Sequence, residues 1–261
     1  MTSSTLNQKN MIQEYANYVG ADDLSPKTVQ KGVKIYNKLL KDQSLVNAGI
    51  SLKADSKMQN AILSILTGMS AETGANNGSF NNLTLEQVKL LSRVIEKETG
   101  GNCYINRAQE KPYLVTYAIN TARFIKTIKR YPNYFKFLNQ FADKKRYSLS
   151  QFRTFIDSSS SKWYVHFRER NQNKESLIRY GLLSGYPLQA TISFFDMESL
   201  PHHVVQLPFG GYIGFNKEID NIFAEKRFIM VKDAYNSFSD TWNKDQKTQL
   251  HDLQPQNRNL L

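Results

Sequence analysis

Apolar residues recur at helical spacing through the first hundred residues, in stretches that helix-capping residues begin or end. These stretches restrict what this chain can fold into more than any other feature. Ser25 followed by Pro26 is typical of a helix start, and apolar residues then recur at helical spacing. Thr84 and Gln87 form a capping box before another apolar stripe, which ends at Gly100. The helices predicted on these grounds span about residues 5–18, 26–42, 56–68 and 84–100.

The helical pattern continues through the middle of the chain. Leu114, Tyr117 and Ile125 fall on one side of a helix that would run from Pro112 to Tyr131. Short helices are then expected over residues 133–142 and after Ser148 or Ser150, and a strand is expected over residues 163–168, where apolar and polar residues alternate.

The last third combines helices with a hairpin. The expected elements are a helix over residues 174–184 that Gly185 stops, a helix that starts at Pro187, strands over residues 203–209 and 212–215 that are split by Gly210 and Gly211, and a long helix over about residues 218–242. The predicted fold class is therefore α+β, predominantly helical, with a small antiparallel hairpin or sheet in the C-terminal half. Three regions are expected: a helical region 1–100, an α+β region 101–246 and a polar tail 247–261.

One segment of this last third has a recurrent pattern. Residues 179–190 read Arg-Tyr-Gly-Leu-Leu-Ser-Gly-Tyr-Pro-Leu-Gln-Ala. This resembles the pattern Arg-x-Gly-x-Leu-x-Gly-Tyr-Pro-x-x-Ala of uncharacterised bacterial and archaeal proteins, in which an aromatic strand and a long helix follow. The resemblance spans about residues 175–242 and implies local architecture only, because no function accompanies it.

The charge of the chain is concentrated in one band. Of the net charge of +11, +9 falls between Arg123 and Arg170, where twelve Lys and Arg meet three acidic residues and twelve aromatic residues. On the predicted helix, the cations fall on a different side from the apolar stripe, and a basic triplet follows. The candidate anion-binding residues are Arg123, Lys126, Arg130, Lys144, Lys145 and Arg146.

This basic band predicts a binding protein that docks an anionic partner, with nucleic acid as the first choice. Lys and Arg neutralise phosphates, and flat aromatic rings stack on unpaired bases. Phe124, Phe135 and Phe152 sit at helical spacing, so we expect them in the core rather than on bases. Other partners left open are an anionic membrane surface, an acidic protein, and a protein partner that an adaptor would bind through the long C-terminal helix.

A cysteine-dependent hydrolase or transferase is the alternative from another class. Cys103 is the one cysteine, and its place after two glycines suggests a helix N-terminus that would stabilise a thiolate. His203 and Asn216 follow in the chain order Cys, His, Asn of papain-like hydrolases, with His203 as base and Asn216 as the residue that orients it. A buried, structural cysteine is the competing interpretation.

Metal and nucleotide chemistry have no motif in the sequence. His202 and His203 are adjacent and would point to opposite faces of a strand, so no metal site is predicted. Without a glycine-rich phosphate loop, no cofactor is predicted. The N-terminus does not resemble a signal peptide, and we expect a soluble, cytoplasmic protein, with non-classical secretion and oligomeric state left open.

Overall fold

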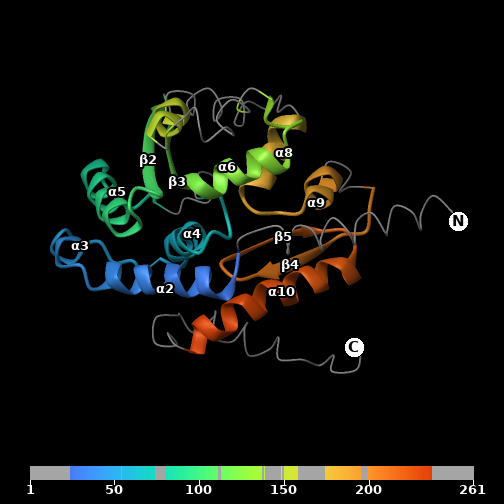
Figure 1. Ribbon diagram of the computed structural model, residues 1–261, viewed down its shortest axis with the longest axis horizontal. Coiled ribbons are helices and arrows are strands. Elements are labelled where there is room, and N and C mark those ends of the chain that lie inside the picture. The colour runs from blue at the N-terminus through green and yellow to red at the C-terminus, as the bar shows by residue number, and fades with distance from the viewer. Residues whose placement is uncertain are drawn as a thin grey trace, which may run out of the picture.

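The computed structural model confirms an α+β fold that is mostly helical (Figure 1). It describes residues 24–53, 55–73, 80–110, 113–136, 138, 148, 150–157, 174–194 and 199–236. The helices are α2 (Pro26–Leu40), α3 (Gln43–Asn47), α4 (Ser56–Leu66), α5 (Leu85–Thr99), α6 (Thr121–Arg130), α8 (Lys174–Leu183), α9 (Leu188–Ser193), α10 (Lys217–Asn236) and an unlabelled helix over residues 150–157. The strands are β1 (Glu72–Thr73), β2 (Cys103–Glu110), β3 (Tyr113–Asn120), β4 (His203–Leu207) and β5 (Gly210–Gly214).

Helix caps place the N-terminal helices where the sequence predicts them. The Ser25 hydroxyl accepts a hydrogen bond from the Thr28 N–H at 3.3 Å, and α2 begins at the proline that follows. Thr84 and Gln87 form the expected capping box of α5, and Gly100 ends that helix in the left-handed conformation. The cap of α4 is Asp55, one residue before the predicted start.

A strand replaces the first half of the helix predicted over residues 112–131. Residues 113–120 form β3, which pairs antiparallel with β2 over its whole length and with β1 at its end. Helix α6 begins only at Thr121, where the Asn120 side chain caps it by accepting a hydrogen bond from the Arg123 N–H at 2.9 Å. Strand β2 pairs with β3 along its whole length and β1 adds a second partner at its end, and local spacing cannot show such partners.

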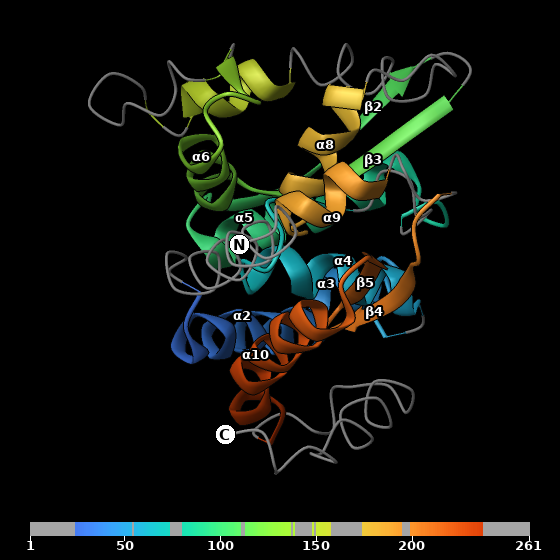
Figure 2. The same ribbon diagram turned by 90° about the vertical axis from the view of Figure 1, so that its right-hand side faces the viewer.

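The three-stranded sheet β1-β3-β2 separates two hydrophobic cores. Cys103, Ile105 and Ala118 point to core 1, the cluster that α2, α4 and α5 form with this face of the sheet. Tyr104, Tyr117 and Ile119 point to core 2, which α6, α8 and the helix over residues 150–157 cover. Figures 1 and 2 both show α2 and α10 on the side of the molecule opposite to α6 and α8. The sheet is therefore covered on both faces, as its alternating buried residues require.

A separate hairpin, β4–β5, lies between α9 and α10. Val205, Tyr212 and Phe223 belong to core 3, which these elements share. The turn falls at Pro208 and Phe209, not at Gly210 and Gly211 as predicted, and Phe209 has a φ of +66°. Proline suits a turn because its φ is fixed and it has no N–H to donate to a strand.

The hairpin and the C-terminal helix also complete core 1. Phe209 at the hairpin tip and Val231 on α10 are buried in the cluster that includes residues of α2, α4 and α5. Helix α10 packs along α2 (Figure 1). Core 1 therefore contains residues from both sides of residue 100.

Other predicted elements have mixed outcomes. Ser148 and Gln151 cap each other at the start of the helix over residues 150–157, as predicted. Gly185, with a φ of +87°, follows the end of α8. The predicted helix 5–18, the strand 163–168, most of the helix 133–142 and the end of the helix beyond residue 236 lie outside the described residues.

Candidate functional site

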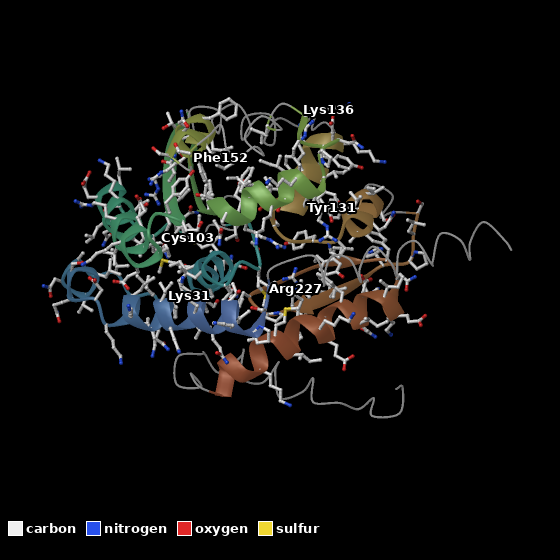
Figure 3. The ribbon with its side chains drawn as sticks, in the orientation of Figure 1. Lys31, Cys103, Tyr131, Lys136, Phe152 and Arg227 are labelled. Atoms are coloured by element: carbon white, nitrogen blue, oxygen red, sulfur yellow. The ribbon has the colours of Figure 1, made fainter. Side chains whose placement is uncertain are left out.

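Helix α2 carries a straight row of exposed lysines. Val29, Val33 and Tyr36 are fully buried against core 1, so the opposite side of the helix faces solvent. The lysine row consists of Lys27, Lys31, Lys34, Lys38 and Lys41, all exposed. Alternating spacings of four and three residues keep these side chains within one face of the helix, over roughly 21 Å at a rise of 1.5 Å per residue. Figure 3 shows nitrogen-tipped side chains on the side of α2 that faces away from α4.

The lysine row is electrostatically uncompensated along most of its length. No acidic residue occurs between Asp23 and Asp42 in the sequence. Lys38 Nζ lies 3.0 Å from Glu98 Oε2 of α5, while Lys27, Lys31 and Lys34 make no ion pair with any residue that the structure describes. The N-terminal part of the row is therefore available to an anion from outside the fold.

The sequence-predicted patch is not arranged as an exposed ridge. Arg123 is only 7% exposed, which corrects its expected surface position, because α6 is covered both by the sheet and by the helix over residues 150–157. Lys126 and Arg130 are half-buried, and the Arg130 guanidinium lies 5.6 Å from the centre of the Tyr131 ring, which Figure 3 labels. The basic triplet over residues 144–146 lies outside the described residues.

Cys103 lies inside core 1 and begins a strand instead of the expected helix. Cys103 is 2% exposed, and its thiol donates a hydrogen bond to the Ile65 carbonyl at 3.5 Å, beside α4 (Figure 3). Burial raises the pKa of this thiol to about 12, so it is protonated at neutral pH. A helix dipole does not act on it as predicted, and these surroundings do not favour a nucleophile.

His203 and Asn216 meet at one buried carboxylate, that of Asp220. His203 Nε2 lies 3.1 Å from Asp220 Oδ2, and the Asn216 backbone N–H donates to the same oxygen at 3.0 Å. The other oxygen, Oδ1, accepts a hydrogen bond of 2.6 Å from the Tyr212 hydroxyl. The Asn216 side chain instead caps α10 by accepting from the Ile219 N–H, so Asp220, and not the Asn216 side chain, lies beside the imidazole.

Glycine at position 214 makes room for this carboxylate. A Cβ atom there would overlap Asp220 Oδ2 and would also collide with the Val205 side chain. The cluster of His203, Tyr212 and Asp220 thus depends on one small residue of β5. This cluster connects the open end of the hairpin to the first turn of α10. Its geometry is explained by this structural role without a catalytic one.

Glu72 is another buried ionisable group, on β1. It is 7% exposed and sits opposite Ile119, so it faces core 2. Burial raises the pKa of its carboxyl group to about 8. Glu72 is therefore largely protonated at neutral pH and adds no negative charge to the interior.

Sequence reasoning missed both the lysine row and Asp220. The row was visible as five lysines without an acid over residues 24–41, but its total excess of +5 is smaller than the +9 of the band after Arg123. Asp220 follows Ile219 and precedes Phe223 on the buried side of α10, and an acidic residue among buried apolar positions signals a specific partner.

Neither a metal centre nor a relative supplies a function. Within the described ranges, no three His, Cys, Asp or Glu side chains are grouped so that they could hold a metal ion. In the same part of the chain, no helix has the length and apolar character needed to cross a bilayer. No family model matches the chain, and neither the curated proteins nor the solved structures contain a match.

Proposed function

We propose that this protein binds nucleic acid by laying the lysine row of α2 along a phosphate backbone. The observation that carries the proposal is the row itself: five exposed cations on one face of one helix, with no acidic residue between them in the sequence. Such a row neutralises several phosphates at once and releases their counterions, which gives sequence-independent affinity.

The side chains around the row favour nucleic acid over a membrane surface. A helix that lies in a bilayer interface inserts apolar side chains beside its cations. The exposed large apolar residues that the structure describes lie on other elements, and Tyr36 of α2 is fully buried. Helix α2 exposes no aromatic ring on which a base could stack. We therefore expect contact with the sugar-phosphate backbone and similar affinity for duplexes of different sequence.

A salt titration of binding to a duplex oligonucleotide tests the proposal. The wild-type protein is expected to give a slope of about −4 for log K against log salt concentration, since each neutralised phosphate contributes roughly −0.9. Replacing Lys31 and Lys34 by Gln is expected to make the slope shallower by about 1.8 and to weaken binding at least tenfold at low salt, again on the basis of roughly 0.9 per phosphate.

The matched control removes the same charge elsewhere. Lys129 on α6 and Lys217 on α10 are exposed, and the variant Lys129→Gln/Lys217→Gln is expected to retain the wild-type slope. Loss of binding in this control with retention in the α2 variant would overturn the placement on α2. Binding to vesicles that contain anionic lipid, without binding to the duplex, would overturn nucleic acid as the partner.

A further inference from the structure

A cavity of about 530 Å³ lies between the helix pair α8–α9 and the hairpin β4–β5. Figures 1 and 2 both show α8 and α9 on one side of the hairpin and α10 on the other. Its volume is within the range of roughly 300–1,000 Å³ that small-molecule sites occupy. The lysine row of α2 contributes nothing to its wall, so this site is independent of the proposed function.

The described wall of the cavity is aromatic and uncharged. Three tyrosines, Tyr180, Tyr186 and Tyr212, contribute rings, and no Lys, Arg, Asp, Glu or His side chain is among the described lining residues. The Gln206 amide supplies a polar group, and the Thr191 hydroxyl already donates a hydrogen bond of 2.7 Å to the Leu188 carbonyl. A charged ligand would lose its hydration here without gaining a partner, which favours a neutral ligand that is mainly apolar.

The wall is held in place by packing that leaves little freedom. Tyr186 and Tyr212 stack with ring centres 5.6 Å apart, and the hydrogen bond from Tyr212 to the buried Asp220 fixes the second ring. At Gly181 of α8, a Cβ atom would overlap the Thr191 side chain of α9, so glycine is what allows these helices to approach. A cavity with such walls is formed before a ligand arrives.

The rim of the cavity exposes apolar side chains to solvent. Phe194, after α9, is 46% exposed, and Val204, on β4, is 64% exposed. Val204 lies opposite Ile213, another lining residue, so the pair forms the hairpin side of the entrance. A ligand that enters would cover apolar surface that now contacts water, which is the main source of affinity in such sites.

We propose that this cavity binds a neutral, predominantly aromatic small molecule of drug-like size. The tyrosine rings contact its apolar body, and the Gln206 amide binds a hydroxyl, carbonyl or amide group on it. The pattern over residues 179–190 then contributes to a binding site, since Gly181, Tyr186 and Ala190 all line the cavity.

Fluorescent probes that differ in one charged group test this inference. N-phenyl-1-naphthylamine is neutral, and 8-anilinonaphthalene-1-sulfonate has a closely similar ring system with a sulfonate. We expect one neutral probe to bind per chain with a micromolar dissociation constant, and the sulfonate to bind at least tenfold more weakly at 150 mM salt. Failure of the neutral probe to bind, or tighter binding of the anion, would overturn the proposal.

Paired variants locate the probe. Val204→Lys places a charge at the rim, and Ile229→Lys places the same group on α10, at a position that is 57% exposed and does not line the cavity. The first is expected to weaken binding of the neutral probe at least tenfold, and the second to change it less than twofold. Ala190→Phe, which fills the cavity from α9, should abolish binding. Equal affinity in the two lysine variants would contradict the proposed site, whether or not Ala190→Phe folds.

Discussion

Helices α2 and α6 are both rich in cations, yet they meet different surroundings. Core 1 covers one side of α2, and its lysine row stays in solvent. Helix α6 contacts β3 and α8, and Phe124 packs edge-on against Phe152 at 5.4 Å, so that even Arg123 is buried. Whether neighbouring elements cover the face that carries the cations decides whether those cations are exposed, and the local excess of charge does not.

The largest expected effect is on thiol chemistry, and it sharpens the contrast between interior and surface. Cys103 should react with a thiol reagent at least ~1,000-fold more slowly in the native protein than in urea, because exposure requires opening of core 1. A thiol introduced by Lys31→Cys in a Cys103→Ala background should react at the rate of a free peptide. Fast native labelling of Cys103 would restore the cysteine enzyme as a candidate.

The pH dependence of stability should reveal the carboxyl group of Glu72. Its pKa is raised from 4.5 to about 8, so the folded state keeps a proton that the unfolded state loses between these values. Stability from this group is complete below pH 4.5 and is lost as pH rises toward 8, at about 1.4 kcal/mol per unit and roughly 5 kcal/mol in total.

The variant Glu72→Gln isolates this contribution. Urea unfolding at pH 5 and pH 8 is expected to show that the variant gains about 3–4 kcal/mol relative to wild type between the two pH values. Glu98, which is half-buried and pairs with Lys38, is replaced by Gln as the control and should show a much smaller change. If the free energy of unfolding declined with pH equally in wild type and in Glu72→Gln, Glu72 would ionise freely in the folded protein.

Truncation of one cation on each helix compares them directly. Arg123→Ala is expected to lower the free energy of unfolding by about 2–3 kcal/mol, because it removes a buried side chain and its packing. Lys31→Ala, at an exposed position, should stay within about 0.5 kcal/mol of wild type. Equal effects in urea unfolding would break the contrast between α2 and α6.

The smallest effect concerns two ion pairs that start from α5. Glu96 forms a bidentate pair with Arg153, at 2.6 and 3.0 Å, and that guanidinium lies 4.1 Å from the centre of the Tyr104 ring. The other pair, Glu98 with Lys38, is open to solvent on the lysine side. Double-mutant cycles should give a coupling of about 1.5 kcal/mol for the first pair and below about 0.5 kcal/mol for the second. Similar couplings would show that burial makes no difference here.

Local signals predicted the parts of the fold that are locally determined. The cap at Ser25, the capping box at Thr84 and the stop at Gly185 each act within a few residues, and each lies at its expected place. Strands β2 and β3 were not predicted, because residues 113–120 fit helical spacing as well as they fit the alternation of a strand. Only the partner strands decide between the two.

The candidate sites divide in the same way. His203 and Asn216 were predicted to act together and do share a partner, but the partner, Asp220, could be found only from the fold. The lysine row of α2 was readable from the sequence, since charge and helix phase suffice for it. The cavity was not, because its walls come from segments that meet only when α8, α9 and the hairpin have docked.

Core 1 cannot be completed during synthesis until Phe209 and Val231 have been made. The apolar side of α2 leaves the ribosome early, but two of its core partners follow it by about two hundred residues. At 5–20 residues per second, the nascent chain carries an incompletely covered core for roughly 10–40 s. Any pause in translation before the last helix prolongs that interval, so the burden that this protein places on chaperones depends on how quickly its final third is made.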